Sequence, residues 1–415
     1  MKLSFRQFSF VLAGLLLTLP TFIYSKNDSS HGRQTYRRLS SLRRSAAESP
    51  LERQFDFRHV TADWTVYGTF SHAPLAADWR KQNTNSLARL TSIHFTDAQH
   101  GWAAGSNGTL FKTNDAGATW ERVALPPEFS RDLLRAVWAL DAQRVRLLGE
   151  YNLTQRPSSA GLDTRAFLLA SDDGGATWQN IEPARPPEKP YRNRRPSGQA
   201  SEQDQVERLN TPILTAFCFA AGAGWLTGES GTIQTTRDGG ASWQMQYAVT
   251  RKLFYDVTAL DAQQAWLVGG SGSILRTVDG GSNWNEQPSA TTNTLRAVHF
   301  IDAKRGWAAG ISGTILATTN GGNRWQAQNS GSSETLNDIR FVNAQEGWAA
   351  GDRGTLLHTR DGGATWQDES LQTHASLNQL FFSAPDCGWV VGTNGSIYQY
   401  SADSGARPAL KGASR

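Results

Sequence analysis

Short apolar segments alternate with polar, glycine-containing turns along most of the chain. Residues 295–328 contain four such segments, at 297–300, 306–310, 314–318 and 325–328. The first alternates apolar and polar side chains, and turn residues bound each of the others, which is typical of β-strands. The pattern therefore predicts units of four consecutive strands.

One motif repeats with this pattern. It reads [Ser/Thr]-x-[Asp/Asn]-x-Gly-x-x-Trp, as in TVDGGSNW at residues 277–284. It returns at residues 113–120, 171–178, 236–243, 318–325 and 359–366. Trp243, Trp284, Trp325 and Trp366 follow one another at intervals of 41 residues. A fixed period of this size indicates stacked supersecondary units.

The motif, called the Asp box below, has a structural interpretation. Its carboxylate or amide can accept hydrogen bonds from its own turn, and its glycine permits positive φ. We expect this role for Asp115, Asp173, Asp238, Asp279, Asn320 and Asp361. Thirteen of the 15 tryptophans stand at repeat positions, seven at the start of fourth strands and six at the start of second strands. We interpret these tryptophans as core residues rather than as a platform for stacking a ligand.

Counting the units gives seven. First strands begin near Leu90, Leu134, Leu214, Asp256, Arg296, Asn337 and Asn378, and the second unit has Arg146 where the others have Trp. No Trp follows the last unit, while Trp79 lies one period before Trp120 without a box of its own. The sequence therefore predicts an all-β, seven-bladed β-propeller over residues 61–405, closed by an N-terminal strand that begins at Trp79.

The N-terminal segment has the layout of an export signal. Lys2 and Arg6 precede an apolar run over residues 8–24. We expect a signal peptide or signal anchor at 1–25, a basic flexible stalk at 26–60 and a flexible tail at 406–415. The predicted location is exported, on a periplasmic or lumenal side. The basic flank after the apolar run favours the opposite orientation, so orientation and cleavage stay open.

Charge and chemistry narrow the functional classes. Residues 1–53 carry nine Lys/Arg against three acidic residues, and because the whole chain carries +4, the remainder carries −2. A slightly acidic body disfavours nucleic-acid binding. The sequence shows no Ser/His/Asp arrangement, metal-ligand cluster or phosphate loop, and we predict no catalytic residue, metal or cofactor. We interpret His94, His299, Cys218 and Cys387 as packing residues.

Two insertions interrupt the period around the second unit, at residues 150–163 and 183–208. In a propeller both connections emerge on the face opposite the Asp boxes. The second insertion holds a basic arm with Arg185, Lys189, Arg192, Arg194 and Arg195 against Glu188. Other polar residues stand where first strands begin on that face: Arg89, Arg131, Arg135, Lys252, Tyr255, Arg296, Asn337 and Asn378. The hypothesis is that Arg89, Arg135, Arg296, Arg192, Arg194 and Arg195 bind a partner; the alternative is that the insertions are tolerated without a role.

The GWAAG and DGGxTW strings resemble those of the photosystem II stability and assembly factor family. The resemblance covers residues 77–400 and implies a seven-bladed propeller that acts without catalysis on the lumenal side, with a basic surface patch. It implies an integral-membrane protein complex as partner. We expect a monomer.

Two other classes stay open. Asp boxes also mark sialidases and some glucan hydrolases, but the Arg-Ile-Pro string of sialidases is absent from this sequence. No pair of acids stands at a place suited to two-carboxylate hydrolysis. The other class is an accessory propeller of a membrane transport or secretion system, which sequence alone does not separate from an assembly factor.

Overall fold

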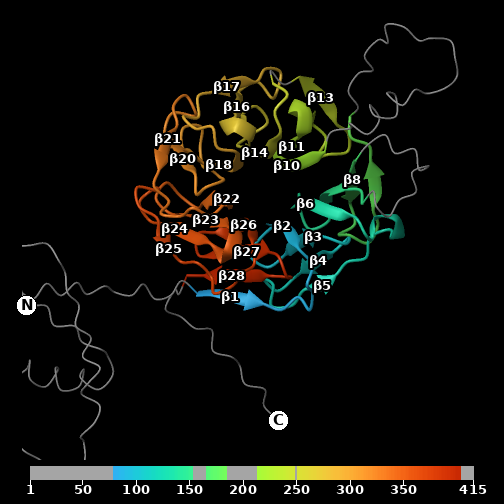
Figure 1. The fold of residues 1–415 in the computed structure, drawn as a ribbon. Coiled ribbons are helices and arrows are strands. Elements are labelled where there is room, and N and C mark those ends of the chain that lie inside the picture. The colour runs from blue at the N-terminus through green and yellow to red at the C-terminus, as the bar shows by residue number, and fades with distance from the viewer. Residues whose placement is uncertain (1–77, 153–164, 185–212, 248–249, 403–415) are drawn as a thin grey trace, which may run out of the picture. The chain divides into compact units, whose positions relative to one another are not determined.

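In the computed structural model, which describes residues 78–152, 165–184, 213–247 and 250–402, seven four-stranded antiparallel sheets form a closed ring (Figure 1). Each sheet is one blade, and its inner strand lies nearest the centre of the ring. This all-β architecture confirms the predicted propeller. The predicted N-terminal segments and the tail at 406–415 lie outside the described residues.

The blades are as follows. Blade 1 comprises β2 (Leu90–Phe95), β3 (Gly101–Gly105), β4 (Leu110–Thr113) and β5 (Glu121–Arg122); blade 2 comprises β6 (Leu133–Ala139), β7 (Val145–Glu150), β8 (Ala166–Ser171) and β9 (Gln179–Ile181). Blade 3 comprises β10 (Leu214–Ala220), β11 (Ala223–Gly228), β12 (Thr232–Thr236) and β13 (Gln244–Tyr247); blade 4 comprises β14 (Phe254–Ala259), β15 (Ala265–Gly269), β16 (Ile274–Thr277) and β17 (Asn285–Gln287). Blade 5 comprises β18 (Leu295–Phe300), β19 (Gly306–Gly310), β20 (Ile315–Thr318) and β21 (Gln326–Gln328); blade 6 comprises β22 (Leu336–Phe341), β23 (Gly347–Gly351), β24 (Leu356–Thr359) and β25 (Gln367–Asp368). Blade 7 comprises β26 (Leu377–Ala384), β27 (Cys387–Gly392), β28 (Ile397–Ser401) and β1 (Asp78–Gln82), and short 3-10 turns lie at η1 (Pro127–Phe129), η2 (Glu229–Gly231), η3 (Gly270–Gly272) and η4 (Asp352–Gly354).

The ring is closed by its first strand. β1 pairs antiparallel with β28, with Trp79 opposite Tyr400 and the two rings 5.3 Å apart. Gln82 at the end of β1 accepts a hydrogen bond from the Trp120 indole of blade 1 at 3.0 Å, just as Gln328 of blade 5 accepts one from Trp366. The N-terminal strand therefore supplies the missing edge, as predicted, and it also links to the next blade, which the sequence did not indicate.

Stacked aromatic pairs hold successive blades together. The Trp307 ring lies flat on Phe341 of the next blade, with centroids 3.6 Å apart and an interplanar angle of 6°. Trp266 on Phe300 and Trp389 on Phe95 repeat the arrangement at 3.8 and 3.6 Å. This packing needs glycine on the second strand. A Cβ at Gly306 would stand 2.5 Å from the Phe300 ring, so a larger residue would displace the ring that the neighbouring Trp covers.

The inner strands share a second device, a β-bulge near their start. The bulge residues are Thr91, Arg135, Thr215, Tyr255, Arg296, Asn337 and Asn378. Four of them donate a side-chain hydrogen bond to the carbonyl of the residue before the bulge in the next blade, at 2.5 to 3.0 Å. Those four are Thr91, Thr215, Asn337 and Asn378. Bulges re-aim a side chain, and here they form clips between blades.

The structure corrects one part of the tryptophan interpretation. The six second-strand tryptophans are buried, with at most 4% of their surface exposed. Among the fourth-strand tryptophans, Trp243, Trp284 and Trp325 are buried, but Trp79, Trp120, Trp178 and Trp366 are only partly buried. The outer edge of a blade has no neighbouring strand, so the rings there cover the box turn on one side and meet solvent on the other.

Candidate functional site

The Asp boxes are turns whose carboxylates are fully engaged. In blade 6, Asp361 accepts hydrogen bonds from the Thr365 backbone N–H at 2.9 Å, the Thr365 hydroxyl at 2.6 Å and the Thr359 hydroxyl at 2.8 Å. These bonds, led by that of the Thr365 hydroxyl, lower the pKa of Asp361 to about 2. An ionised carboxylate with its oxygens engaged is poorly suited to donate a proton. The same geometry recurs at Asp115, Asp173, Asp238 and Asp279, and in part at Asn320.

Arg146 takes over a tryptophan's bond. The indoles of Trp266 and Trp307 each donate to the carbonyl of the glycine after the box Asp or Asn in the next blade, Gly321 or Gly362, at 3.1 Å. At the junction of blades 2 and 3, Arg146 donates from Nε to the equivalent carbonyl of Gly239 at 2.8 Å. The guanidinium therefore replaces the hydrogen bond but not the flat ring.

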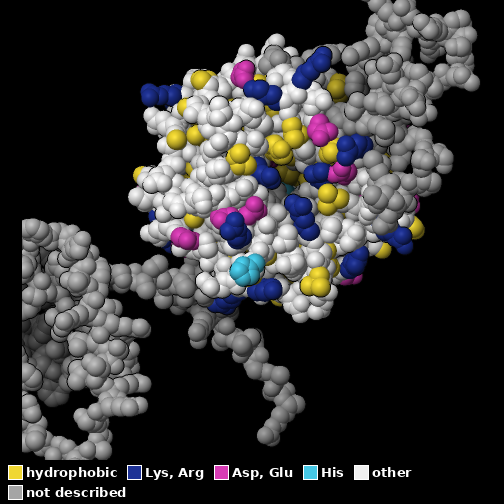
Figure 2. Space-filling model, in the orientation of Figure 1, with side chains coloured by type: hydrophobic (Ala, Val, Ile, Leu, Met, Phe, Trp, Pro, Cys, Tyr) yellow, Lys and Arg dark blue, Asp and Glu magenta, His cyan; other side chains and the backbone are white. Residues whose placement is uncertain are grey.

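The predicted rim lies where the inner strands begin. Arg89 and Arg296 are exposed there, and the Arg296 guanidinium lies over the Tyr255 ring at 5.5 Å. Figure 2 shows Lys and Arg side chains around the centre of the face in view, interspersed with acidic ones. The polar residues at the start of the inner strands have different roles. The Asn337 and Asn378 side chains donate hydrogen bonds to the next blade, so they are not available to bind a partner.

Arg135 is held by an internal carboxylate. Glu150 accepts from Arg135 Nε at 3.0 Å and also from its Nη2, and it accepts from Arg165 Nη2 at 3.3 Å. The Glu150 side chain is 16% exposed, so it is largely shielded from solvent. Arg135 therefore offers an anionic partner less free charge than Arg296 does. Sequence reasoning missed this pairing because 15 residues and a strand hairpin separate the two side chains.

The basic arm lies outside the described residues. Arg192, Arg194 and Arg195 fall in the range 185–212, which the structure does not describe. Most of the other insertion, residues 153–163, also lies outside the described residues. The partner-binding hypothesis for the three arginines stays a prediction.

The centre of the ring holds partly buried titratable groups around Arg340. Burial, with Arg340 nearby, lowers the pKa of both His94 and His299 to about 3, so both are neutral. Their Nδ1 atoms accept backbone N–H bonds from the next blade, at 3.4 Å for His94 and 3.2 Å for His299. Burial raises the pKa of Asp256 to about 7, against the opposing effect of Arg340. These contacts between blades indicate a packing role for both histidines.

Within the described ranges, no group of three or more His, Cys, Asp or Glu side chains is arranged so that it could hold a metal ion. Cys218 is buried and Cys387 half-buried, and both are free thiols. Burial raises the pKa of each thiol, which disfavours the reactive thiolate. No helix within the described part of the chain combines the length and the apolar character that crossing a membrane requires.

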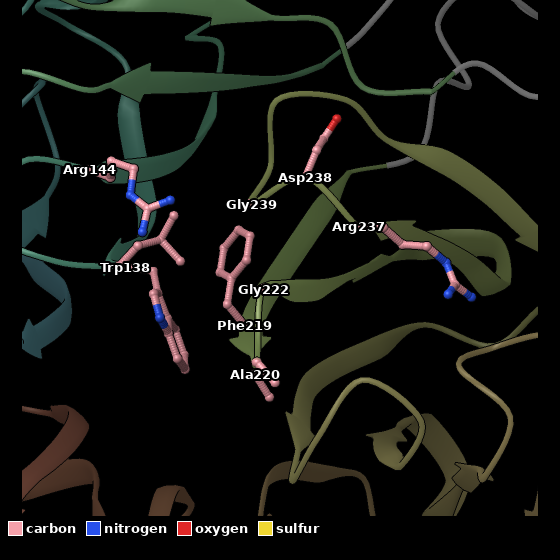
Figure 3. Close-up of a pocket in the computed structure, with 10 residues that line it drawn as sticks. Trp138, Arg144, Phe219, Ala220, Gly222, Arg237, Asp238 and Gly239 are labelled. Carbon is pink, nitrogen blue, oxygen red and sulfur yellow. The ribbon is translucent and has the colours of Figure 1, made fainter.

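A groove on the Asp-box face was not expected from the sequence. It has a volume of about 450 Å³ and lies between blades 2 and 3 (Figure 3). Trp138, Leu140, Arg144, Phe219, Ala220, Ala221, Gly222, Arg237, Asp238 and Gly239 line it. In Figure 3, Trp138 and Phe219 lie close together, Arg144 lies above Trp138, and Arg237 extends away. The available sequence signals were Trp138, which stands outside the repeat positions, and the loss of the usual Trp at Arg146.

Comparison with known proteins places the chain in a family. The sequence profile described as photosynthesis system II assembly factor YCF48 matches residues 72–192, 195–286, 242–329, 287–374 and 328–402. The chain belongs to the YCF48 family. The matches cover all seven blades, so the family resemblance drawn from the repeat strings is confirmed.

Curated relatives carry names of the same family. A photosystem II assembly lipoprotein Ycf48 from Picosynechococcus sp. is 47% identical over 47 residues, 11% of this chain and 14% of the relative. The chloroplastic photosystem II stability/assembly factor HCF136 of Guillardia theta is 40% identical over 58 residues, 14% of each chain. These alignments span about one-seventh of each relative's length. The relatives are assembly factors by name, and those called Ycf48 are lipoproteins by name.

Solved structures agree on the fold. YCF48 bound to a D1 peptide superposes with a TM-score of 0.60 at 22% identity, covering 78% of this chain and 97% of the other. A GH74 xyloglucanase from Xanthomonas campestris superposes with a TM-score of 0.54 at 15% identity, covering 78% of this chain and 53% of the other. At these identities the likeness establishes a shared propeller and carries nothing about hydrolysis.

Proposed function

We propose that this YCF48-family chain is a non-catalytic assembly factor that binds a membrane protein of the photosystem II type. It acts on the exported side of a membrane, where its N-terminal segment directs it, and it works as a monomer. The family match over all seven blades is the observation that carries the proposal. The related structure described as YCF48 bound to a D1 peptide supports a reaction-centre protein as the kind of partner.

The proposed contact surface is the rim where inner strands begin. Four of the seven bulge residues tie neighbouring blades together, whereas Arg296 stays exposed over Tyr255. A guanidinium that the clip pattern leaves available can form paired hydrogen bonds to a carboxylate. We propose that Arg296 and Arg89 fix the register of the partner and that Arg135 contributes when a partner carboxylate displaces Glu150. The arm residues Arg192, Arg194 and Arg195 steer the encounter.

Glycoside hydrolysis is a weaker alternative. The box carboxylates are engaged in turns, and the hydrogen bonds that hold Asp173 and Asp361, led by those of Thr177 and Thr365, lower the pKa of each carboxyl to about 2. A glycosidase needs one carboxyl that keeps its proton near neutral pH. Turnover of a sialoside or β-glucan panel that a single rim substitution abolishes would favour hydrolysis over assembly.

The proposal is tested by charge reversal on opposite faces. Arg89→Glu with Arg296→Glu alters the rim, while Lys304→Glu with Arg324→Glu makes the same charge change on exposed residues of the Asp-box face. Each purified variant is mixed with a detergent-solubilised photosystem II reaction-centre complex and with an immobilised D1 peptide. We expect the rim variant to lose about ten-fold in recovery at low ionic strength, because rim charges act on association. High salt should narrow the difference.

A third variant carries Arg192→Glu, Arg194→Glu and Arg195→Glu and should act in the same direction as the rim variant. Equal recovery of the rim variant and the Asp-box-face control would remove the rim from the mechanism. Unchanged recovery of the arm variant would leave the arm as a tolerated insertion.

A further inference from the structure

We propose that the groove between blades 2 and 3 is a second binding site, for an acidic peptide segment. In this site an aromatic side chain packs against Trp138 from within the groove, and a neighbouring carboxylate bonds the Arg144 guanidinium. The groove is on the Asp-box face, opposite the rim, so this inference goes beyond the proposed function and does not depend on it.

The groove lies at a junction without a stacked Trp–Phe pair. At four other junctions a second-strand Trp covers the Phe of the next inner strand, as Trp307 covers Phe341. At this junction Arg146 turns its guanidinium to the Gly239 carbonyl instead. Trp138, a partly buried ring, contacts Phe219 with centroids 6.0 Å apart and an interplanar angle of 55°, tilted rather than stacked. Both residues line the groove, which lies beside this pair.

A shortened turn between the first two strands of blade 3 contributes no carboxylate to the groove, so Asp238 of the Asp box is the only acidic residue among the described residues that line it. The equivalent turns of other blades carry Asp97, Asp141, Asp261, Asp302 and Asn343. Blade 3 has Ala221 there, in a tight connection where Ala221 and Gly222 have φ of 49° and 80°. The lip that faces Trp138 is therefore small and uncharged.

The outer N–H donors of Arg144 are the hydrogen-bonding groups still available beside Trp138 at the groove. Asp141 accepts from the Gln143 and Arg144 backbone N–H groups and from Arg144 Nε, the last at 2.7 Å. Asp238 is occupied in its box by bonds from Ser242 and Thr236. The Arg144 side chain is 54% exposed, and the bonds to Asp141 engage its Nε, leaving the outer N–H groups for another acceptor. A complementary ligand is therefore an acceptor, and a carboxylate suits a guanidinium best.

The size of the groove suits one side chain with its flanking backbone. A volume of about 450 Å³ falls in the range of ordinary ligand pockets, and the lining combines the Trp138 ring with polar side chains such as Arg144. An aromatic ring in an offset or edge contact with Trp138 would bury the part of that indole that is still exposed.

The test uses fluorescein-labelled pentapeptides and fluorescence anisotropy on the full chain. The probe Gly-Glu-Phe-Glu-Gly is compared with Gly-Lys-Phe-Lys-Gly and Gly-Glu-Ala-Glu-Gly. We expect saturable binding of the first and at least ten-fold weaker binding of the other two, since each lacks one half of the recognition. Arg144→Ser should weaken the first probe about ten-fold, the effect of losing one charge-assisted contact.

Arg305→Ser is the matched control. Arg305 makes the same 2.7 Å bond from Nε to Asp302 in the same turn of blade 5, beside a junction that Trp307 and Phe341 close. It should bind the probe like the unmodified protein, as should the rim variant Arg296→Glu. Trp138→Leu should also weaken binding, with thermal unfolding as the check on its fold; if it unfolds, the Arg144 comparison decides by itself. Absence of saturable binding, equal loss in Arg144→Ser and Arg305→Ser, or equal binding of the alanine peptide would overturn the proposal.

Discussion

Arg146 donates from Nε to the carbonyl oxygen of Gly239 at 2.8 Å, a bond that tryptophan indoles make at other blade junctions. The same guanidinium donates from Nη1 to the Val145 and Ser171 carbonyls and to Asp172, and the residue is 7% exposed. One divergent residue thus keeps the junction of blades 2 and 3 joined without the indole that the other second strands supply.

Replacing this arginine should show that its bonds, not its charge, hold the junction. Arg146→Ala leaves buried carbonyls without partners and should lower the free energy of unfolding by about 2 to 5 kcal/mol. Arg146→Trp restores the repeat residue and should lose less than the alanine variant. Urea unfolding measures both. If the tryptophan variant is no more stable than the alanine variant, the interpretation of Arg146 as a substitute for the indole is wrong.

Truncation tests the closure of the ring. A protein that begins at Asn85 lacks β1, and so exposes the edge of β28 and the faces of Phe382 and Tyr400 that Trp79 covers. We expect a lower melting temperature and aggregation on heating, because an unpaired edge strand recruits other chains.

A protein that begins at Ala77 is the control, since it lacks the N-terminal segment but keeps β1. It should melt like the full chain. A second control, Trp79→Ala in the full chain, should cost about 2 to 4 kcal/mol while leaving the edge paired. Equal melting of the two truncated proteins would contradict the closure.

The partly buried Asp256 should make stability fall as pH rises from about 4 to about 7. Its folded pKa of about 7 lies above the ordinary value of 3.8 because burial disfavours the charged form, so the folded state holds a proton that the unfolded state has released. Stability from this group is therefore complete below about pH 4 and is lost between there and about pH 7. Asp256→Asn should flatten that fall in chemical-denaturation curves measured across this range.

The box residue Asp361 should act in the opposite sense. Its folded pKa of about 2 lies below the ordinary value, so its contribution is present above about pH 4 and is lost as pH falls toward 2. Asp361→Asn, which copies the natural Asn320 box, should remove part of the acid sensitivity and leave the neutral range unchanged. A variant that alters the neutral range instead would show that the box assignment is wrong.

The amino-acid sequence by itself determined the number of blades, their strand order and the closure by Trp79. These features follow from local patterns of turn residues and apolar positions that repeat every 41 residues, and each repeat confirms the others. The family assignment rests on the same repeated strings. The box residues could also be assigned to turns, because every partner of Asp361 lies within four residues of it.

Tertiary structure alone decided which polar side chains are available. Arg135 and Arg296 occupy the same repeat position, yet Glu150 neutralises the first while the second stays exposed over Tyr255. The groove likewise forms where blades 2 and 3 meet, with Trp138 from one blade and Phe219 from the other in its wall. Such contacts join side chains from different strands and blades. They arise where the repeat is broken, so the repeat pattern cannot predict them.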